Sequence, residues 1–444
     1  MAPNAEQINR FNPTSNSDTV SVIGGESVTK WRVVGFLGGV ACVTDIIRSS
    51  MGMLAPVLIQ NYGISEQDMG WILSAWRWGY TPGLLLTAPI VDRLGVWIVM
   101  GLGSALWGVA TLALPLSGAV MWLFVMRFLF GLGHSMRIPG QAAAVSQWFG
   151  TDQRATAVGL CFFGGQVGSA VAPPLVAILL NSFAWTTAYY AIGAGSLVFT
   201  LLWFSLYPRG EAITSPSATT EESAALEENA NEATKVPWLS LFRYRATWGI
   251  ALGQMGYLYA YFFFISWFPS YLALERGMSL LRTGFTTSAI FIMGMVAVVA
   301  GGWLGDNLIR RGVSHNVSRK GIIGSGLTVA TILVVTAAFT SNNQVAVILF
   351  VGCMGALRIT TASANSMPID LAPKGAVASL TSIQNFAGNF SGLLVTIVTG
   401  YLVGASGSFV LPLVVAGGMA ILGAISFVFL VGPLETLPVG RRTA

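Results

Sequence analysis

Ionisable side chains inside apolar stretches are the residues with the clearest chemistry in this chain of 444 residues. The basic ones are Arg48, Arg77, Arg127, Arg137, Arg358 and His134, and the only acid among them is Asp45. A guanidinium at mid-bilayer depth costs about 2.5–3.5 kcal/mol on insertion scales, so it persists where it faces a protein interior, a wet cavity or a partner. One carboxylate does not neutralise five arginines. The pattern predicts an interior site that binds an anion.

The elements that carry these residues are long apolar stretches. The chain is 54% hydrophobic and 9% charged, which excludes a water-soluble globule. Twelve stretches approach the length that crosses a bilayer, at residues 33–58, 69–91, 96–116, 119–147, 155–180, 184–207, 246–270, 283–305, 321–340, 344–368, 375–402 and 409–432. A membrane barrel would show short alternating segments instead. We therefore predict an all-α polytopic membrane protein in contact with the lipid bilayer.

The loops between these stretches predict the orientation. One side holds 16 Lys and Arg residues, and the other holds only Arg276 and Arg282. By the positive-inside rule the first side is cytoplasmic, so both termini are expected in the cytoplasm. The net charge of +5 thus reflects topology, and no nucleic-acid partner is expected.

Composition divides the chain into two halves of six stretches. We expect a disordered cytoplasmic tail (1–30), a first six-helix bundle (31–207), an acidic linker (208–245), a second bundle (246–432) and a cytoplasmic tail (433–444). The halves are pseudo-symmetric, because each has an acid at the end of its second helix and a base just beyond. These pairs, Asp92 with Arg93 and Asp306 with Arg310, are candidate gating residues. Such duplication is typical of proteins whose central site opens to alternate sides of a membrane.

Several motifs carry a family resemblance. The turn Asp92-Arg93-Leu-Gly95, the run from Arg127 to Gly133 and the twelve-helix layout resemble the major facilitator superfamily. The stretches 48–56, 70–80 and 133–139 are similar to its anion:cation symporter family. The resemblance implies alternating access, a cavity lined by the first, fourth and tenth helices, and a bacterial inner (plasma) membrane. Two positions depart from the family pattern, since Ile47 and His134 stand where an Asp and a Glu are usual.

Depth along the predicted helices suggests which charges meet. Arg48, His134 and Arg358 lie within about one turn of the bilayer centre, and we expect Arg48 and Arg358 to clasp the anion from opposite halves. Asp45 is placed to contact Arg137 across the first and fourth helices.

The other basic residues keep two interpretations each. Arg77, three residues before Tyr80, either binds substrate or is structural. Arg137 either binds substrate or is neutralised by Asp45, and it is grouped with Arg127 among the gating or structural residues. His134 either couples proton uptake to anion binding or is a neutral hydrogen-bonded histidine, because its unperturbed pKa is near 6.5. Asp45 is the competing proton carrier.

Polar and aromatic side chains on other helices are candidate cavity walls. They are Tyr80, Gln166, Tyr257, Tyr261, Asn365, Gln384 and Asn385. Tyr257 and Tyr261 belong to a stripe on the seventh helix with Gln254, Phe264 and Phe268. Such an aromatic stripe in a membrane helix more often serves packing than binding.

The function expected from these features is uptake of a small organic anion, such as a sugar acid or an aromatic acid, together with H⁺. Convergent arginines favour a mono- or dicarboxylate, although phosphate and sulfonate fit the same charge. An exchanger without proton coupling and a non-transporting anion receptor are the alternatives. The sequence lacks a phosphate-binding Gly loop, HExxH and Cys/His metal spacing, so we expect no enzyme activity, no metal and no cofactor. A monomer is expected.

Overall fold

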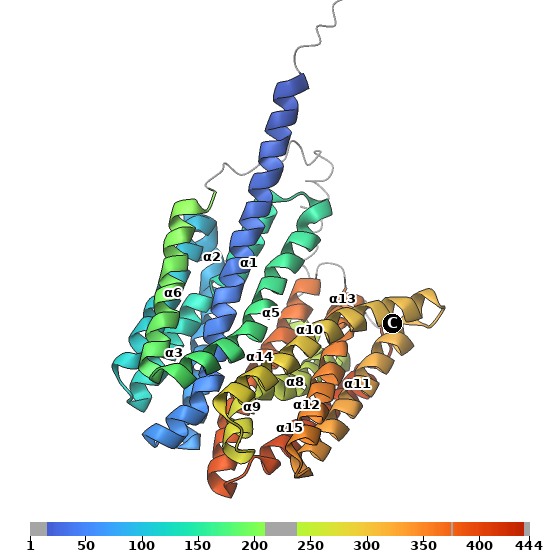
Figure 1. Cartoon of the computed structure of the whole chain (residues 1–444). Coiled ribbons are helices and arrows are strands. Elements are labelled where there is room, and N and C mark those ends of the chain that lie inside the picture. The colour runs from blue at the N-terminus through green and yellow to red at the C-terminus, as the bar shows by residue number, and fades with distance from the viewer. Residues whose placement is uncertain (1–15, 209–237, 374–375, 439–444) are drawn as a thin grey trace, which may run out of the picture.

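The computed structural model describes residues 16–208, 238–373 and 376–438, which are almost entirely helical (Figure 1). The helices form two bundles, one from each half of the chain. The first bundle consists of α1 (Asn16–Tyr62), α2 (Glu66–Ala113), the short η1 (Leu114–Leu116), α3 (Val120–His134), α4 (Arg137–Trp148), α5 (Thr151–Ser182) and α6 (Trp185–Leu206). The predicted fold class is confirmed.

The second bundle repeats this plan. It consists of η2 (Trp238–Arg243), α8 (Arg245–Ser266), α9 (Phe268–Ser270), η3 (Tyr271–Glu275), α10 (Leu280–Arg310), α11 (His315–Phe339), α12 (Asn343–Ile359), α13 (Thr361–Leu371), α14 (Val377–Ser406), α15 (Val410–Ile425) and η4 (Ser426–Leu430). The helices follow the twelve predicted stretches. Nine helical stretches of the described chain are long and apolar enough to cross a membrane. The other three stretches correspond to the first part of α2, the broken pair α3–α4, and α8.

A single glycine separates the second and third predicted spans. Both lie in α2, and the only non-helical residue inside it is Gly95, at φ 77° and ψ 160°. This left-handed backbone is strained for any residue with a Cβ but is open to glycine. The turn predicted after Asp92 and Arg93 is thus made by Gly95.

Two predicted spans are broken at corresponding positions of the two bundles. The fourth span breaks at Ser135 and Met136, between α3 and α4, and the tenth breaks at Thr360, between α12 and α13. Both were predicted as continuous helices. Hydropathy averaged over a span does not reveal such breaks, because the few polar residues at each one, such as His134 and Ser135 or Arg358 and Thr360, are too few to divide a long apolar run.

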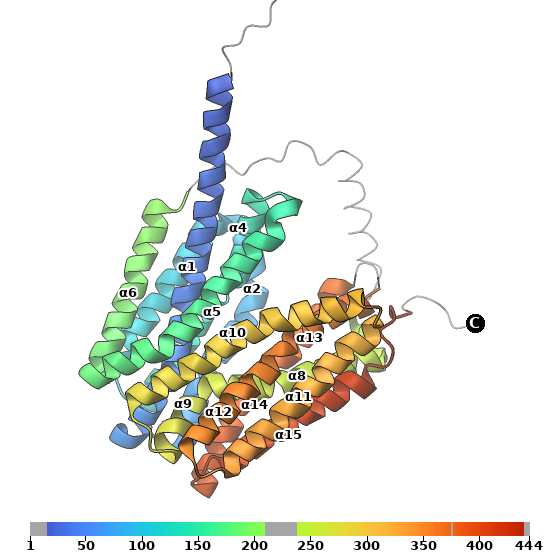
Figure 2. The ribbon, with the colours of Figure 1, turned by 45° about the vertical axis from the view of Figure 1, so that its right-hand side comes forward.

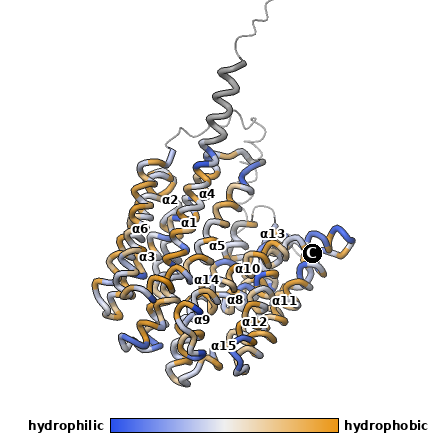
Figure 3. Tube along the Cα trace, in the orientation of Figure 1, coloured by the Kyte–Doolittle hydropathy of each residue, from blue (hydrophilic) through white to orange (hydrophobic). Residues whose placement is uncertain are grey.

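Large apolar side chains cover the outside of the bundles. On α10, for example, Val299 is 74% exposed and Trp303 is 62% exposed. Figure 3 shows apolar residues along the helices and hydrophilic stretches mainly at their ends. Such a surface suits hydrocarbon and would be an aggregation hazard in water.

The bundles meet near the end of the molecule opposite the two termini and are tilted apart towards the other end (Figures 1 and 2). Their backbones approach closely at three glycines. A Cβ on Gly52 of α1 would come within 2.6 Å of the carbonyl oxygen of Ile265, and one on Gly70 of α2 within 2.7 Å of that of Thr396. Gly284 of α10 likewise packs on the carbonyl oxygen of Pro173. Small residues permit this packing of helices.

The predicted tails and linker differ partly from the structure. α1 begins at Asn16, inside the segment predicted to be disordered, because extending an existing helix adds one hydrogen bond for each residue fixed. Most of the predicted linker and residues 439–444 lie outside the described residues. The described part of the C-terminal tail is docked: the backbone N–H of Leu437 donates to the carbonyl oxygen of Leu371 at 2.9 Å.

Candidate functional site

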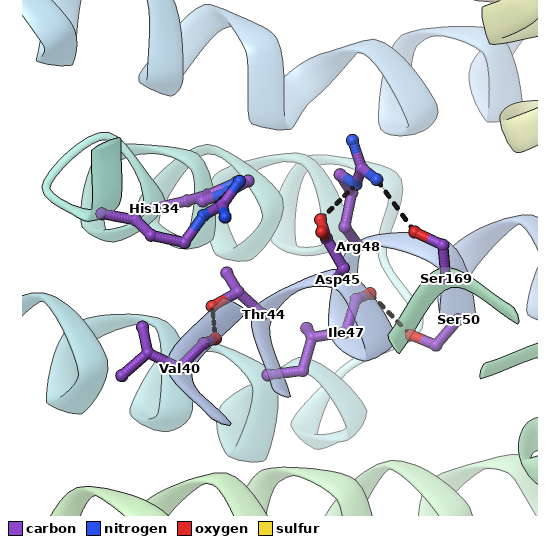
Figure 4. A network of polar contacts seen from close by, with 9 residues as sticks. Val40, Thr44, Asp45, Ile47, Arg48, Ser50, His134 and Ser169 are labelled. Carbon is purple, nitrogen blue, oxygen red and sulfur yellow. Dashed lines mark hydrogen bonds and ion pairs between the residues drawn. The ribbon is translucent and has the colours of Figure 1, made fainter. Parts of the chain in front are cut away.

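Asp45 and Arg48 form an ion pair inside the first bundle. Arg48 Nε lies 3.0 Å from Asp45 Oδ1, one turn away on α1, and Arg48 Nη2 donates to Ser169 Oγ of α5 at 3.2 Å (Figure 4). The ion pair lacks the alignment of a hydrogen bond. The Arg48 side chain is 15% exposed and that of Asp45 8%. The central guanidinium is therefore paired but still within reach of a ligand.

His134 and Arg137 meet across the break between α3 and α4. Arg137 Nε donates to His134 Nε2 at 3.2 Å, and both side chains are buried. Because arginine has no acceptor, Nε2 must be the unprotonated nitrogen of the imidazole. His134 Nδ1 and Arg137 Nη1 have no hydrogen-bond partner. The predicted contact between Asp45 and Arg137 is wrong: Asp45 pairs with its own-helix neighbour, since residues three apart on a helix face each other.

Trp76 of α2 lies at the centre of the first bundle's charges. Its ring stacks on His134, with centroids 5.8 Å apart, and lies 6.0 Å from the Arg48 guanidinium. Tyr80 is 5.1 Å from the His134 ring and is half-buried. The structure thus brings three predicted site residues of the first bundle, Arg48, His134 and Tyr80, together around the Trp76 indole.

Arg77 lies at the boundary between the bundles. Its guanidinium carbon is 4.4 Å from the Trp76 ring on one side and 4.1 Å from the Phe262 ring of α8 on the other. The residue is only 1% exposed, and none of its three side-chain nitrogens has a hydrogen-bond partner. Aromatic faces attract a guanidinium, but they do not replace its hydrogen-bond acceptors.

Arg358 anchors a second polar cluster, beside the α12–α13 break. Arg358 Nη1 donates to Tyr257 Oη of α8 at 3.0 Å, and Tyr257 Oη lies 2.8 Å from Thr361 Oγ1. Tyr261 covers the guanidinium at 4.7 Å. Every partner of this arginine is neutral. In the part of the chain that the structure describes, no carboxylate lies within 4 Å of Arg77, Arg127, Arg137 or Arg358.

The remaining candidates do not converge. Gln254 Nε2 contacts Asn365 Oδ1 at 3.5 Å, while Gln384 Nε2 donates to the carbonyl oxygen of Ala364 at 2.9 Å. Asn385 is exposed, and its amide donates to its own helix. Gln166 is half-buried on α5, one turn before Ser169. Asn365 is thus tied to Gln254, while Gln384 and Asn385 are tied to backbone carbonyl oxygens.

The gating candidates fall into two groups. Arg127 is 2% exposed and lies 5.1 Å from the Phe130 ring, beside a gap with no room for a water molecule. Its environment fits the structural interpretation. Arg93 is exposed just before Gly95 in α2, and Asp306 and Arg310 are exposed near the end of α10. The Asp92 side chain lies outside the described residues.

Three residues of the site were not singled out from the sequence. Ser169 binds Arg48, Trp76 organises the charged cluster, and Phe262 covers Arg77. The spacing of Gln166 and Ser169 on one helix face was a usable signal for the first. Trp76 and Phe262 carried no such signal, because an aromatic residue in a membrane helix is usually packing. Phe264 and Phe268 do pack, against Phe350.

Comparisons with known proteins agree with this architecture. The sequence model of the Major Facilitator Superfamily matches residues 37–396. The D-galactonate transporter of Escherichia coli is 29% identical, covering 90% of this chain and 94% of its own length. The hexuronate transporter of Bacillus subtilis is 27% identical, covering 92% and 95%.

A solved structure shows the same fold. The crystal structure of a bacterial homologue of the human lysosomal transporter Spinster superposes with a TM-score of 0.71 at 17% identity, covering 91% of this chain and 95% of that one. The matched family and relatives are membrane transporters and not enzymes, as the sequence predicted. With most of its length matched and the same two-bundle fold, this chain belongs to the major facilitator superfamily.

Proposed function

We propose that this protein is a proton-coupled symporter that takes up an organic anion of the sugar-acid class across a bacterial inner membrane. One observation carries the proposal: the interior holds five arginines, of which only Arg48 has a carboxylate partner, Asp45, among the described residues. A positive interior without counter-ions favours an anionic substrate. The sugar-acid transporters among its relatives support the class of anion.

Arg48 and Arg358 are the proposed substrate anchors. Among the interior arginines, only Arg48 is partly exposed. Its ion pair with Asp45 is not aligned as a hydrogen bond. Arg358 is held in place by Tyr257 and offers its remaining N–H groups. A planar guanidinium pairs bidentately with a carboxylate, so two of them on facing bundles orient a sugar acid. Tyr80 and Gln166 supply polar contacts nearby.

Asp45 is the proposed proton carrier. A substrate carboxylate that binds Arg48 competes with Asp45 for the same guanidinium, and the displaced Asp45 then takes a proton. Anion binding and proton uptake are linked in this way. His134 suits the role less well, because it accepts a hydrogen bond from Arg137, and a protonated imidazole would face that guanidinium as a like charge.

The test uses purified protein in liposomes with radiolabelled D-galactonate. We expect an inward proton gradient to drive accumulation by the wild type. Asp45→Asn should abolish that accumulation while retaining exchange against preloaded substrate, because exchange needs no net proton transfer. His134→Gln is the matched control and should keep gradient-driven uptake within about threefold, roughly 0.7 kcal/mol.

Anion exchange without protons is the second candidate, and one observation favours it. Both protonatable side chains, Asp45 and His134, already contact arginines. If wild-type protein exchanges D-galactonate but ignores the proton gradient, the exchanger is correct and the symporter is refuted. If neither assay moves any of a panel of sugar acids, the proposed substrate class is wrong.

A further inference from the structure

The seam between α2 and α14 is the feature from which we infer a second anion site. The two helices run antiparallel and touch at successive levels. A Cβ on Gly400 would meet the carbonyl oxygen of Glu66, and one on Gly70 would come within 2.7 Å of that of Thr396. Further along, a Cβ on Gly392 would come within 2.7 Å of the guanidinium carbon of Arg77. These three contacts follow one another inwards from the end of the molecule opposite the termini, and the contact between Gly392 and Arg77 lies deepest.

The second bundle encloses Arg77 without satisfying it. Phe262 of α8 covers one face of the guanidinium, and Gly392 of α14 leaves room for its edge. All five N–H donors are buried without an acceptor. Burial of an unpaired charge is expensive, and the two ring contacts offset only part of that cost. Among the interior arginines of the described residues, Arg77 is the only one whose three side-chain nitrogens are all buried without a hydrogen-bond partner.

The surface around Arg77 exists only while the bundles are closed at this end. Trp76 belongs to the same helix as Arg77 and moves with it, whereas Phe262 and Gly392 belong to the other bundle. Separation of the bundles along the α2–α14 seam would remove both at once. Arg77 would then face the opening with its N–H donors free. Arg48 lies nearby, because the Trp76 ring is close to both guanidiniums.

We propose that Arg77 is a second binding group for the carboxylate of the substrate, available only when the bundles are open at the end opposite the termini. When the seam closes, the Phe262 ring covers the Arg77 guanidinium, so that the carboxylate is no longer able to bind there. The anion then stays bound to Arg48. With both termini in the cytoplasm, the end opposite the termini lies at the outer face of the membrane. The inference rests on the proposed function, and it adds a side-specific step to it.

The experiment compares D-galactonate transport from the two faces, in right-side-out and inside-out membrane vesicles. Arg77→Gln should raise the KM about tenfold from the outer face and leave it within about twofold from the inner face, since one charge-assisted contact is lost on one side only. Equal changes from both faces, or none from either, would overturn the proposal.

Phe262→Leu is the matched variant. It removes the covering ring but keeps Arg77, so the KM from the outer face should stay within about twofold of the wild type. If Arg77 is only a structural latch, both variants change the transport rate alike without a sided change in KM, and the proposal fails.

A second measurement does not depend on the substrate. In a variant without the native cysteines, Arg77→Cys should react with a membrane-impermeant thiol reagent added at the outer face and be protected from it at the inner face. A cysteine that is unreactive from outside would overturn the proposed opening. If the wild-type protein transports none of a panel of sugar acids, the proposed function is refuted, while this labelling result still stands.

Discussion

The two bundles share one plan but place different chemistry at equivalent positions. In the first bundle, the broken fourth span carries His134 and Arg137, and α1 supplies an ion pair. In the second bundle, the broken tenth span carries Arg358, whose partners are the hydroxyl of Tyr257 and the ring of Tyr261. The proposed proton carrier, Asp45, lies in the first bundle, whereas the second bundle holds Arg358 with neutral groups.

This difference suggests a division of labour. A cation held by phenols keeps the same partners whatever the proton concentration, so it serves as a passive anchor. A cation paired with a carboxylate has a competitor for any incoming anion, so its binding is linked to protonation. The comparison teaches that pseudo-symmetry repeats the helix breaks while leaving each half free to differ in side-chain chemistry.

Loss of the first-bundle anchor should have the largest effect. Arg48→Ala is expected to lower kcat/KM for D-galactonate about a hundredfold, because a bidentate charge-assisted contact is worth roughly 3 kcal/mol. Exchange of D-galactonate against preloaded substrate in liposomes measures it, because exchange needs no net proton transfer and so does not depend on Asp45. The double variant with Asp45→Asn is the control, since it removes the carboxylate left without a partner. Uptake that survives in both variants would mean that the anchors lie elsewhere.

Loosening the second-bundle anchor should have an intermediate effect. Tyr257→Phe removes the hydroxyl that joins Arg358 to Thr361 and is expected to raise the KM roughly five- to tenfold, about 1–1.5 kcal/mol. It should leave the proton dependence of uptake unchanged, because the proposed proton carrier, Asp45, lies in the first bundle. A shifted proton dependence in this variant would erase the distinction between the halves. Tyr261→Phe, which keeps the ring over Arg358, is the matched control.

Removal of a side chain outside both clusters should have the smallest effect. Asn385→Ala truncates an exposed amide that donates to the carbonyl oxygen of Thr381 on its own helix. Uptake is expected to stay within about twofold of the wild type. A larger rise in KM would show that this face of α14 turns towards the substrate, and it would extend the second-bundle site beyond Arg358.

Much of the fold was predictable from local signals. The spans follow from runs of apolar residues, and the turn at Gly95 follows from a charged motif that ends in glycine. The breaks beside Met136 and Thr360 were missed, because the short polar segments that contain them lie within long apolar runs. The partner of Asp45 was missed as well, although the i, i+3 spacing of Asp45 and Arg48 on one helix was a usable local signal.

The sequence alone determined the chemistry in the interior of this protein. Arg48, Arg77 and Arg358 stand in apolar stretches with almost no acids, and depth in a membrane helix follows directly from position along the chain. Tertiary structure decided which partners they have. Arg48 faces Asp45, Arg358 faces Tyr257, and Arg77 lies between two rings of different bundles, because the rotation of each helix and the approach of its neighbours set the direction of every side chain.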